Sequence, residues 1–357
     1  MSRKLYTVGP INVSADTLQA MDRPMMTHRT KEYKALHHGI MEKMHKALGT
    51  DDDIFLVAGS ATVLLEGAAR NGIRKHSLGL TGGSFGDRSI EVAKLNGRQV
   101  DVLKKPMGIG FTPADLEGKV TSDIDAVHWV SNESSSGVQL DNVALAKEVR
   151  DQNPDAIVMI DAVTSMFALD HRMKELQADS VVFGSQKDLA LPPGIAFVVV
   201  SKEMMKRSEK MENKGFYADF VKLKEKNDED YALTTPPVSL MYGLDYQLDK
   251  MLKEGMATRY RRHEEMAEMV RKWADEKMEG IFPEKGFESK TIGVVKRGDL
   301  DFDRFHSIIK SKGMEISNGY GDAKKSTFRI GTMGDLTKDD IKQLLTTMDE
   351  ALEEMKQ

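Results

Sequence analysis

The sequence predicts an α/β fold: a mostly parallel seven-stranded sheet flanked by helices, followed by a small C-terminal α+β domain. Between about residues 50 and 240, short apolar runs alternate with helical periods, as in a parallel sheet that is covered on both faces. At 357 residues the chain is also too long for one compact core. The pattern changes from about residue 278, where shorter strands and helices begin to alternate.

Seven short apolar runs, several rich in β-branched residues, are the strand candidates. They are Ile54–Val57, Leu78–Thr81, Gln99–Leu103, Ala126–Val130, Ile157–Ile160, Ser180–Phe183 and Ile195–Val200. Helical periods such as 63–71 and 143–151 separate most of them. Ligands of such sheets bind outside the carboxyl ends of the strands, so we expect the functional residues there.

The second half of the chain predicts a surface excursion, two long helices and a small domain. The excursion, Met204 to about Asp230, is rich in Lys, Glu and Met. The expected elements after it are helices at 237–251 and 255–273, a strand at 291–295, a helix at 302–311, strands at 314–317 and 327–330, and a helix at 338–355 that begins at Thr337 with Asp340 in a capping-box-like position. We predict a large domain at 15–255 and a small domain at 256–357, with residues 1–14 packing on the small one.

Composition narrows the function classes. The net charge of -5 gives no electrostatic footprint for nucleic acid or an anionic membrane surface. No apolar run approaches the roughly 20 residues that span a bilayer. Because the chain has no cysteine, disulfides, thiolate metal sites and cysteine nucleophiles are excluded, which fits the reducing cytoplasm. The nine histidines lack zinc-site spacing. We expect a cytoplasmic protein without a metal.

Two single polar residues follow buried strands and indicate the chemistry. Lys187 comes after the run 180–183, and Asp161 ends the run 157–160, 26 residues earlier. A lysine that forms a Schiff base and a carboxylate that holds a pyridinium nitrogen are what pyridoxal phosphate chemistry needs. The alternatives are a lysine in a surface loop and an aspartate that caps the helix start at Val163.

Two small-residue turns are candidates for binding such a cofactor. Ser60, Ala61 and Thr62 lie between a strand and a helix start, where free N–H groups and the helix dipole favour a phosphate. The alternative is a hydroxyl helix cap without a ligand. Phe85 lies among glycines after the next strand and could place its ring against a planar cofactor, or it could be an ordinary core residue.

Two further candidates concern the oxygen atoms of a cofactor or substrate. Ser135 is the middle of three serines after the strand 126–130, and such hydroxyls could donate to a phenolate oxygen or a substrate, or form an ordinary loop. Arg329 has apolar neighbours on both sides in a strand. An inward arginine fits a substrate carboxylate, whereas an outward one would be an exposed strand residue.

In order along the chain, these segments resemble the class V aminotransferases, which are fold-type I enzymes of pyridoxal 5′-phosphate. The branch most similar is the alanine–glyoxylate and serine–pyruvate group, with its archaeal relatives of broad or phosphoserine specificity. The resemblance covers nearly the whole chain. Its motifs are Gly9-Pro10, His28–Tyr33, Gly59–Thr62, Phe85–Arg88, Asn132–Gly137, Asp161, Gly184–Lys187 with Pro192–Gly194, Gly215–Tyr217, Thr235–Val238 and Phe328–Gly334.

The resemblance implies a role for each matching position. Lys187 would be the aldimine lysine and proton carrier, Asp161 would pair with the pyridine nitrogen, and Arg329 would bind the substrate carboxylate. The remaining cofactor contacts would be Ser60, Ala61, Thr62 and Gln186 at the phosphate, Val163 and Phe85 on the two faces of the ring, Ser135 near the phenolic oxygen, and Thr235 at the phosphate from a second subunit. The resemblance thus implies a homodimer acting on small amino acids and 2-oxo acids.

The chain departs from the family pattern at four places: Ala61, the serines 134–136, Thr234 and Thr332.

From the resemblance we expect an aminotransferase that moves an amino group from an L-amino acid such as alanine, serine or aspartate to glyoxylate, pyruvate or 2-oxoglutarate. The alternatives are a phosphoserine or 2-aminoethylphosphonate transaminase, another pyridoxal phosphate reaction such as a lyase or decarboxylase, and a binding protein without a cofactor. The sequence does not fix the amino donor.

Overall fold

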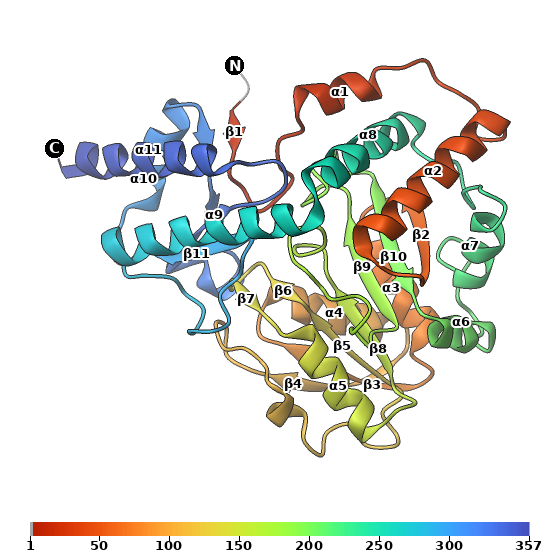
Figure 1. Cartoon of the computed structure of the whole chain (residues 1–357). Coiled ribbons are helices and arrows are strands. Elements are labelled where there is room, and N and C mark those ends of the chain that lie inside the picture. Colours follow the sequence, from red (N-terminus) through yellow and green to blue (C-terminus); the bar gives the residue numbers. More distant parts are fainter. Residues whose placement is uncertain (1–2, 357) are drawn as a thin grey trace.

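A seven-stranded sheet forms the centre of the computed structural model, which describes residues 3–356 (Figure 1). The spatial order is β2-β10-β9-β8-β5-β3-β4. The strands are β2 (Asp53–Ala58), β3 (His76–Thr81), β4 (Gln99–Lys104), β5 (Ala126–Val130), β8 (Ile157–Asp161), β9 (Ser180–Gly184) and β10 (Ile195–Val200). Only β10 runs antiparallel to its neighbours. All seven predicted strands and the mostly parallel sheet are confirmed.

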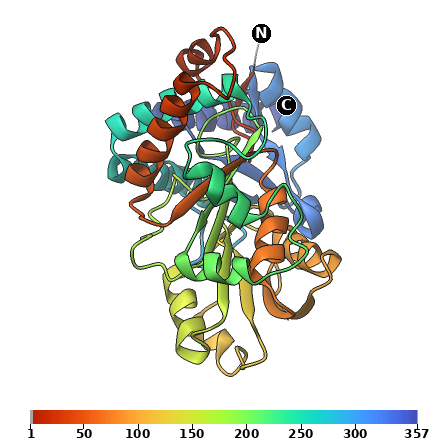
Figure 2. The ribbon, with the colours of Figure 1, turned by 90° about the vertical axis from the view of Figure 1, so that its right-hand side faces the viewer.

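Helices cover both faces of this sheet, as Figure 2 shows with the sheet seen between them. One apolar cluster joins the sheet to α2 (Lys31–Leu48), α5 (Asn142–Gln152) and α8 (Val238–Glu254). A second cluster joins the opposite face to α3 (Thr62–Gly72), α4 (Ser84–Leu95), α6 (Lys202–Glu209) and α7 (Phe220–Asn227). Helix α1 (Ala15–Met21) packs on α8. The sequence pattern had not predicted α1, α2 or α4.

The predicted surface excursion at 204–230 is wrong. This segment forms α6 and α7, which pack against α3 and β2. Met204 and Phe220 are fully buried, and Leu223 is nearly so. The many lysines and glutamates of the segment hide a few apolar residues at helical spacing, and burial of those residues holds both helices on the sheet.

The C-terminal part is built on α9 (Met256–Lys277), which begins directly after Gly255, a residue with a φ of 83°. Strands β11 (Ile292–Lys296), β14 (Thr327–Gly331) and β13 (Ser317–Asn318) form one sheet. Helices α10 (Phe302–Ser311) and α11 (Lys338–Lys356) pack with them. The cap predicted at Thr337 is formed, because Asp340 Oδ2 accepts from the Thr337 N–H at 2.8 Å and Thr337 Oγ1 accepts from the Asp340 N–H at 3.2 Å.

The single strand predicted at 314–317 is instead two short strands in different sheets. β13 joins β14, whereas β12 (Met314–Glu315) pairs with β1 (Lys4–Leu5). The N-terminal segment then passes along β14: the Gly331 N–H donates to the Tyr6 carbonyl at 2.7 Å, and a Cβ at position 331 would lie 2.1 Å from the Thr7 carbonyl oxygen. These contacts join residues 4–7 to the C-terminal part. The domain boundary at residue 255 stays a prediction.

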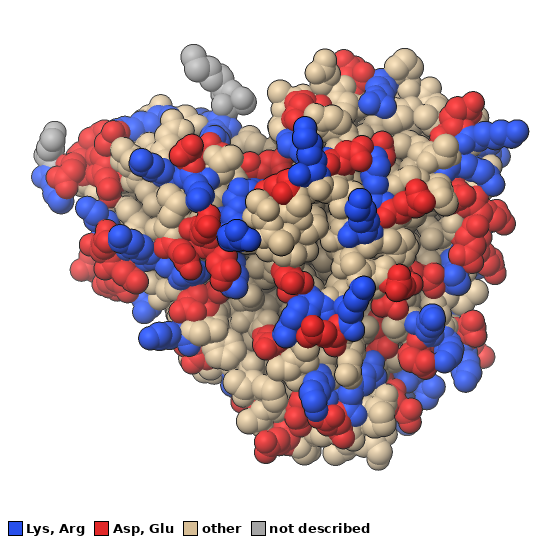
Figure 3. All heavy atoms as spheres, viewed as in Figure 1, with Lys and Arg blue, Asp and Glu red and all other residues tan. Residues whose placement is uncertain are grey.

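The remaining short elements lie in loops: β6 (Asn132–Glu133) pairs with β7 (Val138–Gln139), and η1 (Pro113–Leu116) and η2 (Gly321–Lys325) are 3-10 turns. On the face shown in Figure 3, basic and acidic side chains are interspersed. Within residues 3–356, no helix is both long and apolar enough to cross a membrane.

Candidate active site

A cavity of about 340 Å³ lies at the carboxyl ends of β2, β8 and β9. It brings together eight of the eleven residues singled out in the sequence: Ser60, Ala61, Thr62, Phe85, Asp161, Val163, Gln186 and Lys187. Ser135, Thr235 and Arg329 do not line it. The common edge of the parallel strands explains why positions so distant in sequence meet.

Lys187 lies in the turn after β9, beneath the N-terminal segment. Its Nζ donates to the Val8 carbonyl, and a Cβ on Gly9 would lie 2.9 Å from that Nζ. Gly9 has a φ of 94°, so the close approach and the left-handed backbone both require glycine. Burial lowers the pKa of Lys187 to about 8, and the charge of Arg329 acts in the same direction. The amine is thus easily deprotonated.

Asp161 ends β8 and is almost fully buried. Its Oδ1 accepts a hydrogen bond from the Val163 N–H at 2.9 Å, while Oδ2 accepts none from the described residues. No helix begins here, so the helix-cap alternative is wrong. Burial raises the pKa of Asp161 to about 6, and Glu133 adds to the increase. A carboxylate with one free oxygen and a desolvation penalty is suited to a cationic N–H partner.

The turn at 60–62 precedes α3 with its backbone donors free. Within residues 3–356, the N–H groups of Ser60, Ala61 and Thr62 donate to no acceptor. The residue before the helix is Ala61, and no side chain caps it, so the hydroxyl-cap alternative is not realised. Free donors at a helix N-terminus fit a phosphate. Gln186 lies close by, folded against Gly184, where a Cβ would be 2.6 Å from Gln186 Oε1.

Phe85 lies in the first turn of α4, and two residues that the sequence analysis missed hold it. The Glu133 carboxylate accepts from the Phe85 and Gly86 N–H groups at 3.0 and 2.9 Å. Tyr320 stacks on the Phe85 ring with centroids 5.6 Å apart, and the Arg88 guanidinium lies 4.8 Å above that ring. Glu133 lies three residues after the end of the buried strand β5, a position that the sequence could have indicated, whereas Tyr320 lies in a loop that carries no such pattern.

Ser135 does not line the cavity. Its hydroxyl donates to Glu133 Oε1 at 2.5 Å and accepts from the Ser84 N–H at 3.0 Å, so it supports the start of α4, and its contact with the phenolic oxygen stays a prediction. Ser134 is the serine of this loop that lines the cavity. Thr235 lies outside the cavity of its own chain, and its contact with a second subunit stays a prediction.

Arg329 lies in β14, beside the cavity and half-buried. Its Nε donates to the Asn318 carbonyl at 2.9 Å and its Nη1 to the Ser134 carbonyl at 3.2 Å. The guanidinium carbon is 5.2 Å from the centre of the Tyr320 ring. Burial lowers the pKa of Arg329. The two carbonyl oxygens that accept these bonds are neutral, so they orient the guanidinium without neutralising its positive charge. That charge is available to bind an anion.

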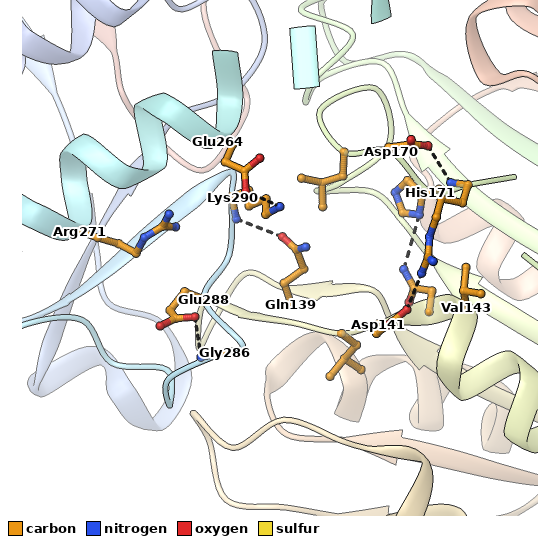
Figure 4. A pocket seen from close by; sticks show the side chains of 14 residues that line it. Gln139, Asp141, Val143, Asp170, His171, Glu264, Arg271, Gly286, Glu288 and Lys290 are labelled. Carbon is orange, nitrogen blue, oxygen red and sulfur yellow. Dashed lines mark hydrogen bonds and ion pairs between the residues drawn. The ribbon is translucent and has the colours of Figure 1, made fainter. Parts of the chain in front are cut away.

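A larger cavity, of about 540 Å³, lies between the start of α5 and α9 (Figure 4). None of the residues proposed from sequence line it. Two ion pairs lie within its lining, with Lys290 2.6 Å from Glu264 and Arg172 2.9 Å from Asp141. Within residues 3–356, no group of three or more His, Asp or Glu side chains is placed to bind a metal ion. The candidate active site is therefore the smaller cavity.

Residues 89–344 match the family model described as aminotransferase class-V, which is more than half of the chain. The chain belongs to this family. An uncharacterised aminotransferase from Methanocaldococcus jannaschii is 30% identical, over 99% of this chain and 94% of that protein. The L-aspartate–glyoxylate aminotransferase of Paracoccus denitrificans is 29% identical, over 93% and 87% of the two chains.

Among solved structures, the alanine–glyoxylate aminotransferase of a Nostoc species superposes with a TM-score of 0.91 at 23% identity, covering 99% of this chain and 96% of that one. The fold is that of the fold-type I aminotransferases. As a class V aminotransferase the chain is an enzyme, and its family implies pyridoxal 5′-phosphate as the cofactor.

Proposed function

We propose that this class V aminotransferase moves the amino group of a small L-amino acid, such as alanine, serine or aspartate, to glyoxylate, pyruvate or 2-oxoglutarate, with Lys187 as the catalytic amine. The observation that carries the proposal is that Lys187, Asp161 and the free N–H groups at 60–62 line one cavity. The activity in the name of the Paracoccus relative supports an acceptor of the glyoxylate type.

The cavity fits pyridoxal phosphate by its chemistry. The free donors at 60–62 and the Gln186 amide suit the phosphate, and the unpartnered Asp161 Oδ2 suits a protonated ring nitrogen. Val163 and Phe85 line the cavity as apolar groups for the two faces of the ring. When bound, the cofactor supplies an electron sink for the negative charge that develops at the substrate Cα.

The chain's own residues then have three tasks. Asp161 keeps the proton on the ring nitrogen, because a buried carboxylate without that partner is costly. Lys187 would take the proton from the substrate Cα and deliver it to the cofactor carbon C4′, and a pKa of about 8 places its amine near the working pH. Arg329 binds the substrate carboxylate and fixes the orientation of the Cα–H bond.

We also propose a homodimer in which Thr235 of one chain completes the phosphate site of the other. The position of Thr235 outside the cavity of its own chain supports this arrangement. Sedimentation of the holoenzyme should give twice the mass of 39.8 kDa, and Thr235→Ala should weaken cofactor binding. A monomer with full activity would contradict the shared site.

Arg329→Ala is expected to raise KM for every amino acid and 2-oxo acid tested, because all of them carry the carboxylate that Arg329 binds. Loss of a desolvated charge pair of this kind costs about 2–5 kcal/mol. Steady-state kinetics across the substrates measure the effect. Arg329→Lys is the matched control. It keeps the charge but loses the bidentate geometry, so its KM should lie between that of the wild type and that of Arg329→Ala. Unchanged constants in both variants would place Arg329 outside the site.

A donor panel tests the proposed reaction. Alanine, serine, aspartate, glutamate, phosphoserine and 2-aminoethylphosphonate are each offered with glyoxylate, pyruvate or 2-oxoglutarate. We expect the first three donors to react fastest and the absorbance of the bound cofactor to change with the donor and return with the acceptor. Preference for phosphoserine or the phosphonate would favour the alternative substrates. Product formation without the reversible change would favour a lyase or decarboxylase.

A further inference from the structure

Two fully buried titratable side chains lie directly behind Lys187 and have no role in the reaction proposed above. Asp188 follows Lys187 in the turn after β9, and His263 lies within α9. His263 Nε2 is 3.6 Å from Asp188 Oδ1, and both side chains have no exposed surface. Among residues 3–356, neither His263 Nε2 nor Asp188 Oδ2 has a hydrogen-bond partner. Buried polar atoms without a hydrogen bond require an explanation.

The hydrogen bonds around the pair determine which nitrogen carries a proton. His263 Nδ1 is 2.8 Å from the Arg259 carbonyl, which can only accept, so Nδ1 holds a hydrogen. In a neutral ring Nε2 is then a bare acceptor. The Gly334 N–H donates to Asp188 Oδ1 at 3.1 Å. A carboxylate facing a bare nitrogen would be repulsive, so a further proton must lie between the two groups.

The charged groups around the pair also limit its ionisation. Arg259 donates to the Asp188 backbone carbonyl and is within 3.3 Å of both Glu254 and Asp335. Arg262 is 2.7 Å from Glu254 and donates to the Gly334 and Leu336 carbonyls. The two arginines share Glu254, and Asp335 pairs with Arg259. The charges of Arg259, Lys187 and Arg262 each act to lower the pKa of Asp188, against the larger opposite effect of burial.

We propose that Asp188 and His263 share one proton, and that this pair is a positioning element that sets the charge beside Lys187, neutral while the proton is held and negative once it is lost. While the proton is held, Asp188 places no full negative charge beside Lys187 and does not stabilise its ammonium form. The same pair fixes the Gly334 N–H, so it also joins the turn that carries Lys187 to the segment after β14. The effect on Lys187 rests on the function proposed for that residue.

The titration behaviour follows from burial. Burial raises the pKa of Asp188 to about 7 and lowers the pKa of His263 well below its usual value. Because an unfolded aspartate has a pKa of about 3.9, the folded state binds the extra proton more tightly. Stability from this proton is complete below about pH 4 and is lost as the pH rises to about 7. Above that pH, Asp188 is negative and favours the protonated form of Lys187.

Asp188→Asn tests the pair, because an amide can donate to His263 Nε2 and accept from the Gly334 N–H without titrating. The Tm of the cofactor-free wild type minus the Tm of Asp188→Asn should decrease between about pH 4 and 7 and then stay constant. The contribution of His263 titration is present in both proteins, so it largely cancels in the Tm difference. A Tm difference independent of pH would overturn the shared proton.

The holoenzyme tests the effect on Lys187. The pH midpoint of the absorbance change of the bound cofactor should be lower in Asp188→Asn than in the wild type, by roughly one unit, about 1.4 kcal/mol. His263→Gln, whose amide can donate to an ionised Asp188, should not lower it. Equal midpoints in the wild type and Asp188→Asn would overturn the positioning role. Reductive labelling of another lysine would instead overturn the proposed function, while the Tm comparison still decides the shared proton.

Discussion

Replacing Lys187 by alanine is expected to abolish multiple turnover. Lys187 is the only lysine among the residues that line the cavity, and it has two tasks there, covalent attachment of the cofactor and movement of the proton at the substrate Cα. Gln186 beside it has no titratable amine. Loss of a group with both tasks removes several orders of magnitude in rate, and steady-state assays with the best donor measure the loss.

The control for this variant is Lys202→Ala. Lys202 is an exposed lysine at the start of α6, beyond β10, and its loss should leave kcat unchanged. Lys187→Ala should still bind cofactor through Asp161 and the turn at 60–62, so absorbance of the purified protein shows that the fold and the cavity persist. Turnover at more than a few per cent of the wild-type rate would contradict the role of Lys187.

Asp161→Asn is expected to leave the cofactor bound and to lower kcat severely. The amide has the same shape and can still accept from the Val163 N–H, but it cannot keep the ring nitrogen protonated. The negative charge that forms at the substrate Cα then loses its stabilisation, and such an electrostatic contribution is typically worth about 3–4 kcal/mol. Single-turnover kinetics with an excess of amino acid measure this step directly.

Asp161→Glu is the informative companion, because it keeps the charge and displaces it by one methylene. Its rate should lie between those of the wild type and Asp161→Asn. If Asp161→Asn turned over at nearly the wild-type rate with cofactor bound, the pairing of Asp161 with the ring nitrogen would be wrong.

Much of the sheet could be predicted because most of its strands, with β4 at the edge as the exception, are buried. Runs such as 195–200 are continuous apolar segments that no amphipathic helix resembles. Helix α4 was missed because its first turn, Ser84–Arg88, contains a glycine and follows two more. Its start is held by the Glu133 carboxylate from another segment. Such tertiary capping leaves no local pattern, and α6 and α7 were missed because their charged residues outnumber their apolar ones.

The residues of the candidate site likewise include some that the sequence could predict and some that it could not. Lys187, Asp161 and the turn at 60–62 were predictable because each follows an element that the sequence predicts and the strand ends share one edge. The hydrogen bond from Ser135 to Glu133 was not predictable, because a hydroxyl near a strand end reveals neither its direction nor the carboxylate that binds it. Tyr320, Asp188 and His263 depend on the packing of the C-terminal part against the sheet, which one sequence does not reveal.

Borohydride reduction of the holoenzyme, followed by peptide mapping, tests the central claim most directly. Reduction fixes the cofactor to the amine that holds it, so the modified peptide identifies that amine without reference to any activity. We expect one phosphopyridoxyl group per chain, on Lys187, in the peptide that also contains Asp188. A label on any other lysine, or none in a protein that retains the cofactor's absorbance, would contradict the account.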